Sequence, residues 1–159
     1  MTREISNSED ILDSRDIIAR VAELESDLET WKEDQRPTNG TQDNCADCGV
    51  MPGEPHKEEC TGGLHDAVRE EDFDEWDELQ ALKQLAEQGE SSRDWRYGET
   101  LIRDSYFEEY AQQLAEDIGA IDRNANWPLG HIDWEAAAEA LKQDYMEVDF
   151  SGVTYYIWA

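Results

Sequence analysis

The apolar residues near the N-terminus form the first regular pattern of the chain. They are spaced by four, three, four and three positions: Ile17, Val21, Leu24, Leu28 and Trp31. This spacing places side chains on one face of an α-helix, so it predicts a helix over residues 6–36. Ser6 and Glu9 form a capping-box pattern at its start, and Pro37 follows its end.

The same stripe has the spacing of a coiled-coil seam, sustained for about two heptads. One interpretation is therefore a homodimer formed through these five residues. The other is that the helix packs against its own domain. The spacing alone does not choose between them.

A second helix is predicted over residues 65–88, where apolar residues recur at every third position: Phe73, Trp76, Leu79, Leu82 and Leu85. Gly89 is predicted to end it. Its first half is densely acidic: Glu70, Glu71, Asp72, Asp74, Glu75, Asp77 and Glu78. We interpret these seven carboxylates as a partner-binding face. The alternative is a solvated face that only keeps the protein soluble.

The C-terminal third alternates between helical and strand patterns. Leu101 and Ile102 predict a short turn or strand anchored on the core. Ser105 and Glu108 form a capping box before a helical stripe that ends at Gly119. Asp133 is a predicted N-cap of a short helix. After it, apolar and polar residues alternate on both sides of the Ser151–Gly152 pair, which predicts a two-residue β-hairpin.

Three cysteines and a histidine follow the N-terminal helix. They are arranged as Cys45-x2-Cys48 and His56-x3-Cys60. Three thiolates and one imidazole suit a closed structural zinc site, so zinc is the predicted cofactor. His65 could replace His56 as the fourth ligand. The alternative is a flexible loop with free, reduced thiols.

The predicted fold class is therefore α+β and mostly helical. An N-terminal helix or coiled coil occupies residues 1–36, and a linker with the zinc loop occupies residues 37–64. An acidic amphipathic helix follows at residues 65–90. An α+β unit of two helices and a hairpin completes the chain at residues 91–159.

The net charge of the chain limits the classes of partner that it can bind. Forty acidic residues against thirteen basic ones give a net charge of -27 over 159 residues. Such a surface repels nucleic acid and favours basic proteins or DNA-binding grooves. The first residues lack a signal-peptide pattern, and no apolar run is long enough to span a bilayer. We expect a soluble protein of the cytoplasm, in a bacterial host cell, with no membrane partner.

Sequence patterns of known catalytic sites are missing. The chain has no phosphate-binding glycine loop, no G-x-S-x-G and no H-E-x-x-H. His131 lies beside a predicted helix start and is interpreted as a structural or surface residue. The prediction is a protein that is not an enzyme.

The C-terminal block resembles the C-terminal region of the antirestriction ArdA family, which is carried by plasmids, transposons and phages. Three segments carry the resemblance: SYFEEYAQQLAEDIGAI, HIDWEAAAEALKQDY and FSGVTYY. They cover about the last third of the chain, which also resembles uncharacterised phage proteins that carry this block. ArdA proteins have three domains in tandem, whereas here a helix and a Cys/His loop replace the first two.

The resemblance implies inhibition of a type I restriction-modification complex by imitation of DNA. A helix over residues 66–88 would be about 34 Å long, and one DNA strand of that length carries about ten charges. Segment 66–88 has a net charge of -7, and segment 1–40 has -6 over a longer span. The second helix is therefore the predicted contact surface. The alternative function is a zinc-stabilised, coiled-coil-dimerising phage adaptor.

Overall fold

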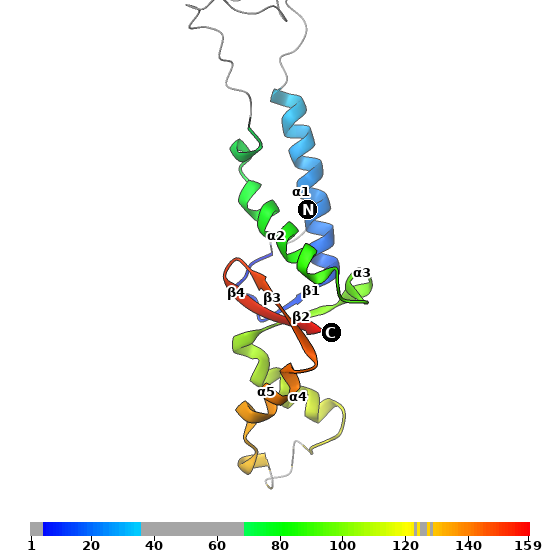
Figure 1. Cartoon of the computed structure of the whole chain (residues 1–159), viewed down its shortest axis with the longest axis vertical. Helices are drawn as coiled ribbons and strands as arrows, with labels where there is room; N and C mark the ends of the chain where they lie inside the picture. The colour runs from blue at the N-terminus through cyan, green and yellow to red at the C-terminus, as the bar shows by residue number, and fades with distance from the viewer. Residues whose placement is uncertain (1–4, 36–68, 123, 125–126, 128) are drawn as a thin grey trace, which may run out of the picture. The chain divides into compact units, whose positions relative to one another are not determined.

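The computed structural model describes residues 5–35, 69–122, 124, 127 and 129–159. These residues form an α+β protein with five α-helices and one four-stranded antiparallel sheet (Figure 1), which confirms the predicted class. The chain divides into two compact units. Unit 1 comprises Met1–Glu23 and Glu78–Ala159, and unit 2 comprises Leu24–Asp77.

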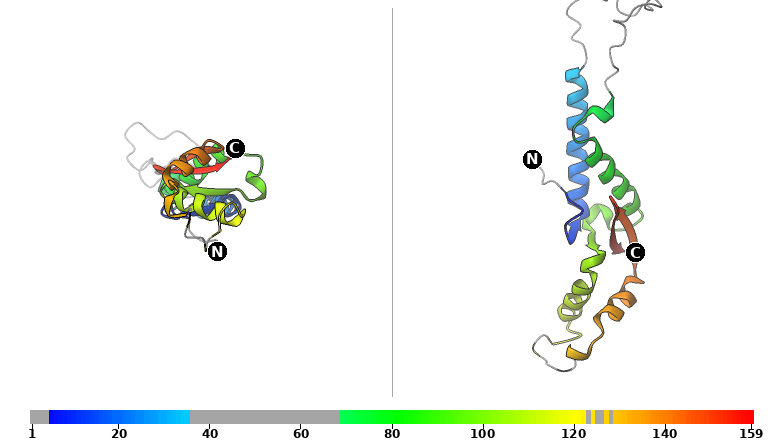
Figure 2. Two further views of the ribbon diagram at one scale, coloured as in Figure 1. Left: turned by 90° about the horizontal axis from the view of Figure 1, so that it is seen from below. Right: turned by 90° about the vertical axis from the view of Figure 1, so that its left-hand side faces the viewer.

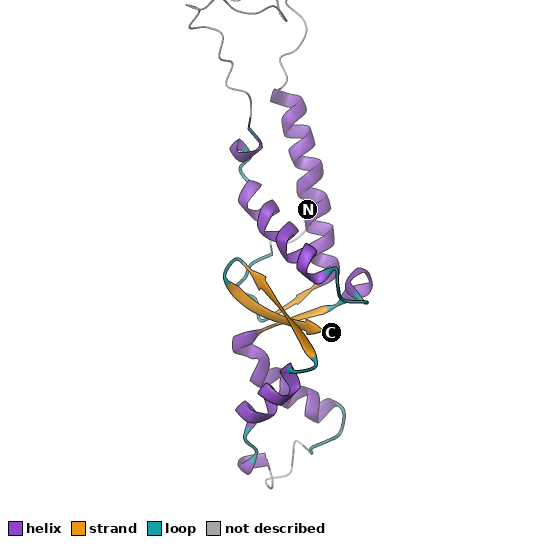
Figure 3. Ribbon diagram, in the orientation of Figure 1, coloured by secondary structure: helices purple, strands orange, loops and turns teal. Residues whose placement is uncertain are grey.

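The sheet lies in unit 1 and joins strands that are far apart in sequence. Its order is β1 (Ile11–Asp13), β2 (Thr100–Arg103), β4 (Val153–Trp158) and β3 (Tyr145–Phe150). The predicted hairpin is confirmed as the β3–β4 pair (Figure 3). Ser151 and Gly152 both have positive φ angles, 50° and 81°, which two-residue type I′ turns require.

Helices cover both faces of this sheet. One face packs on α4 (Phe107–Asp117) and α5 (Trp134–Lys142) through Ile102, Tyr145 and Tyr156. The other face carries the buried Leu101, Tyr155 and Ile157, because neighbouring residues of a strand point to opposite sides. On that side lie the parts of α1 (Ser14–Gln35) and α2 (Trp76–Gly89) that belong to unit 1 (Figures 1 and 2).

The structure confirms the predicted end of α4 and the predicted start of α5, and in both places residues close in sequence form the cap. Gly119 has a φ of 73°, and its N–H donates to the Glu116 carbonyl at 3.0 Å. The Ala120 N–H donates to the Ala115 carbonyl at 2.9 Å, which completes a Schellman motif. The Asp133 carboxylate accepts the Ala136 N–H at 3.0 Å, as an N-cap should.

The capping box predicted at Ser105 and Glu108 does not form. A 3-10 helix, η2 (Asp104–Tyr106), precedes α4, and Tyr106 takes the N-cap position without a side-chain cap. The chain passes directly from β2 into this turn, and the Phe107 N–H donates to the Asp104 carbonyl.

The N-terminal helix begins later than predicted. Residues 6–13 are not helical, because β1 pairs antiparallel with β2, with Leu12 opposite Leu101. α1 starts at Ser14, whose buried hydroxyl accepts the Glu99 N–H at 2.6 Å and donates to the Trp95 carbonyl at 2.7 Å. This pairing links residues almost ninety positions apart, so the local spacing could not reveal it.

The acidic helix is also shorter than predicted. Regular helix begins at Trp76, after a 3-10 turn, η1 (Glu70–Asp72), and a break at residues 73–75. In a continuous helix, Glu71 would face Glu75 and Asp74 would face Glu78, and such like-charge pairs destabilise a helix. Residues 65–68 lie outside the described part. The helix ends at Gly89 as predicted, but this glycine is the last helical residue and has no positive φ; it instead allows the close approach of the Trp95 ring.

The C-terminal unit therefore begins before residue 91. The compact unit that holds β2, α4, α5 and the hairpin also includes residues 78–90 and the N-terminal segment up to Glu23. The Tyr155 hydroxyl, on β4, donates to the carbonyls of Glu9 and Asn7 at 2.6 and 3.1 Å. The N-terminal segment is thus an integral part of the sheet unit.

The buried tyrosines predict a loss of stability in alkali. Burial raises the pKa of Tyr155 to about 12, and burial also raises the pKa of Tyr145. Between pH 10 and 12 an unfolded chain loses these protons while the folded chain keeps them. The contribution of these tyrosines to the free energy of unfolding is thus fully present below about pH 10 and is lost above it. For Tyr155 alone the loss is about 2 kcal/mol. Urea denaturation at pH 8 to 11 measures this slope.

Tyr155→Phe is the matched variant for this measurement. It removes the phenol that ionises, so the fall in stability between pH 10 and 11 should be shallower than in the parent protein. An equal slope in both proteins would contradict the assignment to Tyr155.

Candidate functional site

The described residues of unit 2 carry a dense set of exposed carboxylates. We call these eleven residues the acidic surface: Glu25, Asp27, Glu29, Glu33, Asp34, Glu70, Glu71, Asp72, Asp74, Glu75 and Asp77. Two basic residues, Lys32 and Arg69, accompany them in this described part of the unit, so its 21 residues have a net charge of -9. No other described stretch of similar length is as acidic.

Two contacts hold the 70–73 segment against the second half of α1. The rings of Trp31 and Phe73 lie 5.9 Å apart between centroids, and Phe73 is buried. Lys32 Nζ contacts a carboxylate oxygen of Glu70 at 2.6 Å and one of Glu29 at 3.2 Å. These contacts bring acidic residues from two separate segments onto one unit.

Lys32 is the cation around which this arrangement is organised. The Glu70 and Glu29 carboxylates raise the pKa of Lys32 above its ordinary value, so it stays protonated at neutral pH. Its charge offsets the repulsion between the two segments. Glu29 and Glu70 are correspondingly less available to an external cation than their neighbours.

The seven carboxylates predicted as the partner-binding face have different environments. Glu78 belongs to unit 1, where Arg20 binds both of its oxygens at 2.8 Å and also contacts Glu23 at 2.9 Å. Asp72 accepts the Arg69 N–H at 3.1 Å. Four of the seven are exposed and have no hydrogen bond or ion pair with any described residue: Glu71, Asp74, Glu75 and Asp77.

The carboxylates of α1 were not predicted as part of this surface. Averaging charge over residues 1–40 hides them, because the first half of that segment is nearly neutral. Residues 24–35 alone hold five acids and one base. A charge count by half-helix is the sequence signal that could have found them.

The proposed coiled-coil seam is largely covered within one chain. Ile17, in unit 1, is fully buried, and Leu24 and Leu28, in unit 2, are also buried. Val21 and Trp31 are half-buried. Side chains buried in this way favour the second interpretation, in which the helix packs within its own chain.

The predicted zinc ligands cannot be placed. Cys45, Cys48, His56 and Cys60, as well as His65, lie outside the described residues. In the part of the chain that the structure does describe, no group of three His, Cys, Asp or Glu side chains could hold a metal ion. The zinc site therefore stays a prediction from the cysteine and histidine spacing.

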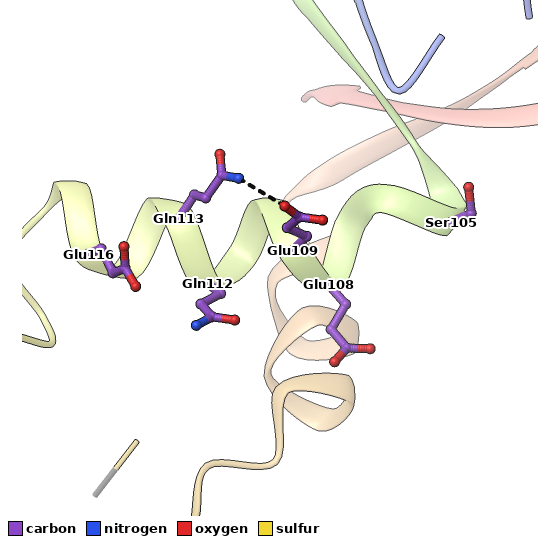
Figure 4. A pocket seen from close by; sticks show the side chains of 6 residues that line it. All are labelled: Ser105, Glu108, Glu109, Gln112, Gln113 and Glu116. Carbon is purple, nitrogen blue, oxygen red and sulfur yellow. Dashed lines mark hydrogen bonds between the residues drawn. The ribbon is translucent and has the colours of Figure 1, made fainter. Parts of the chain in front are cut away.

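A shallow hollow of about 530 Å³ follows the solvent side of α4 (Figure 4). Its lining residues recur at spacings of three and four, as expected for one helix face: Ser105, Glu108, Glu109, Gln112, Gln113 and Glu116. Among the residues drawn, one weak hydrogen bond joins Gln113 to Glu109 at 3.4 Å. This is the polar side of an amphipathic helix and offers hydrogen bonding rather than chemistry. His131 is exposed in η3 (Leu129–His131).

Comparison with known proteins adds no relative. The chain matches no family model, no curated protein and no solved structure. The ArdA-like resemblance therefore stays an expectation from the quoted segments. Within the described ranges, no helix has both the length and the apolar composition needed to cross a membrane.

Proposed function

We propose that this chain is an acidic inhibitor that occupies the DNA-binding groove of another protein. The observation that carries the proposal is the acidic surface of unit 2, with eleven exposed carboxylates and a net charge of -9 in 21 described residues. A groove built for phosphates is basic, so a surface of this charge is complementary to it.

The number of charges supports imitation of a duplex. Residues 24–35 of α1 rise about 18 Å along the helix axis. B-DNA carries one charge per about 1.7 Å when both strands are counted, which gives about eleven phosphates over that length. The acidic surface supplies eleven carboxylates, five from this stretch of helix and six from the 70–77 segment. After Lys32 and Arg69 are subtracted, the net charge of -9 over this length is one charge per about 2 Å, somewhat below that of the duplex.

We further propose that the target is a type I restriction-modification complex. This step rests on the ArdA-like segments of the C-terminal block. The sheet unit then serves as the folded platform, and unit 2 provides the contact surface.

A competition experiment tests this function. Purified full-length protein should displace labelled duplex DNA from a type I restriction-modification complex, and displacement should weaken as salt rises. Expression in a restricting host should also raise the plating of unmodified phage. Unchanged DNA binding and unchanged plating would reject the proposal.

The zinc proposal has a separate test. Purified protein is expected to contain about one zinc per chain, and a Cys45→Ser/Cys48→Ser double variant should lose it, because two of four ligands are removed. Elemental analysis measures the metal. Full zinc occupancy in the double variant would contradict this ligand set.

A further inference from the structure

Two arginines of the sheet unit have no ionic partner among the described residues. Arg93 and Arg96 lie in unit 1, between α2 and β2, and both side chains are exposed. Neither makes an ion pair or a side-chain hydrogen bond with any described residue. This is unusual for a chain with forty acidic and thirteen basic residues, in which carboxylates compete for every cation.

Five other basic side chains in the described part of the chain have an ionic partner: Arg15, Arg20, Lys32, Arg103 and Lys142. Arg15 contacts Asp13 at 2.6 Å, Arg103 contacts Asp10 at 3.9 Å, and Lys142 contacts Asp104 at 2.7 Å. Arg93 and Arg96 remain unpaired although Glu90 and Asp94 are close to them in sequence. Their guanidinium groups are therefore available to an external anion.

The backbone that carries the two arginines is firmly held. Between and beside them, Trp95 is 3 % exposed, and a Cβ atom added at Gly89 would lie 2.2 Å from its ring. The Trp95 carbonyl accepts the Ser14 hydroxyl, and the Ser92 hydroxyl donates to a Glu99 carboxylate oxygen at 2.9 Å. A ligand at this place meets a segment that is already ordered, so binding costs little backbone entropy.

The surface beside the arginines is hollowed, and an exposed tyrosine follows them. A hollow of about 360 Å³ is lined by Glu90, Ser91, Ser92, Arg93, Trp95 and Arg96. Tyr97, on α3 (Trp95–Gly98), is 79 % exposed directly after them in the chain. Tyrosine and arginine are enriched where proteins bind each other, because both provide large contact areas and directed hydrogen bonds.

We propose that Arg93 and Arg96, with Tyr97 beside them, anchor a carboxylate-bearing segment of a partner protein. The planar guanidinium fork binds a carboxylate through two parallel hydrogen bonds. Nucleic acid is the less suitable anion, because its many phosphates are all repelled by a chain of net charge -27. A single carboxylate is repelled far less at physiological salt, where the Debye length is about 8 Å.

Nuclear magnetic resonance of the ¹⁵N-labelled full chain tests this anchor. The probe is a blocked acidic peptide, acetyl-Gly-Glu-Asp-Gly-amide, and the signals are the arginine Nε–Hε groups. The peptide should shift the Arg93 and Arg96 signals saturably. The double variant Arg93→Gln/Arg96→Gln should weaken binding about tenfold or more, because it removes charge-assisted hydrogen bonds.

Arg103→Gln is the matched control. Arg103 carries the same group and 30 % of its side chain is accessible, but it is already paired with Asp10, so this variant should bind the peptide as the parent does. Unchanged backbone amide signals outside residues 90–98 show that each variant is folded. Equal shifts at all arginines, or equal binding by the double variant, would overturn the proposal. Stronger binding of a single-stranded oligonucleotide at this site would also overturn it.

Discussion

Phe107→Ala is expected to lower the free energy of unfolding by about 3–5 kcal/mol. Phe107 is fully buried where α4 begins, and its ring centroid lies 5.1 Å from those of both Tyr145 and Tyr156, in edge-on contacts. Lys142 Nζ lies 5.6 Å from the same centroid. Alanine would leave a cavity among β3, β4, α4 and α5, which urea denaturation followed by circular dichroism would detect.

Two other variants make this result specific. Phe107→Leu keeps most of the buried volume, so its cost should be clearly smaller than that of alanine. Ile118→Ala, just after the same helix, changes a residue that is 70 % exposed and should alter stability by less than about 0.5 kcal/mol. A cost below about 1 kcal/mol for Phe107→Ala would mean that α4 does not pack on the sheet as described.

Neutralising the free part of the acidic surface is expected to abolish most of the inhibition. The quadruple variant changes the four carboxylates that have no described partner: Glu71→Gln, Asp74→Asn, Glu75→Gln and Asp77→Asn. Each exposed charge pair is worth about 0.2–1 kcal/mol, so the loss of four should lower affinity for the target about fourfold to several hundredfold. The salt dependence of displacement should become shallower, because fewer charges take part.

The control for this variant has the same net charge. Glu108→Gln, Glu109→Gln, Glu116→Gln and Asp117→Asn remove four charges from α4 instead, and should leave inhibition close to that of the parent. Equal losses in both variants would show that only total charge matters. Full activity in both would support the alternative function, in which the acidic residues only confer solubility.

Sequence patterns predicted the elements whose signals are local. The hairpin depends on Ser151 and Gly152, the end of α4 on Gly119, and the start of α5 on Asp133. In each case the residues that determine the backbone conformation lie within a few positions of one another. That is why these elements agree with the structure.

The differences come from interactions that a spacing pattern does not contain. β1 forms because residues 11–13 pair with β2, and a periodic stripe read along one segment assigns them to the helix. The acidic helix breaks before Trp76 because its carboxylates repel each other, although its apolar residues continue at the expected positions. Here electrostatics outweighs hydrophobic periodicity.

The candidate site was predicted in part. The 70–77 segment was found from its charge. A charge count by half-helix could have found the carboxylates of α1, but only the contacts of Lys32 with Glu70 and of Trp31 with Phe73 show that the two segments lie together. The ion pair between Arg20 and Glu78 could not be predicted from the sequence either, because these residues are 58 positions apart. Arg93 and Arg96 could be recognised only once the partners of other cations were known.

The strand order also determines when the sheet can be completed during synthesis. β4 lies between β2 and β3, yet it follows β1, β2 and β3 in the chain. Until β4 has left the ribosome, Ile102 and Arg103 on β2 lack the strand with which they pair. The nascent chain therefore exposes this edge of β2 until synthesis has passed Trp158. The net charge of -27 makes neighbouring nascent chains repel each other during that interval, which opposes pairing between their exposed strand edges.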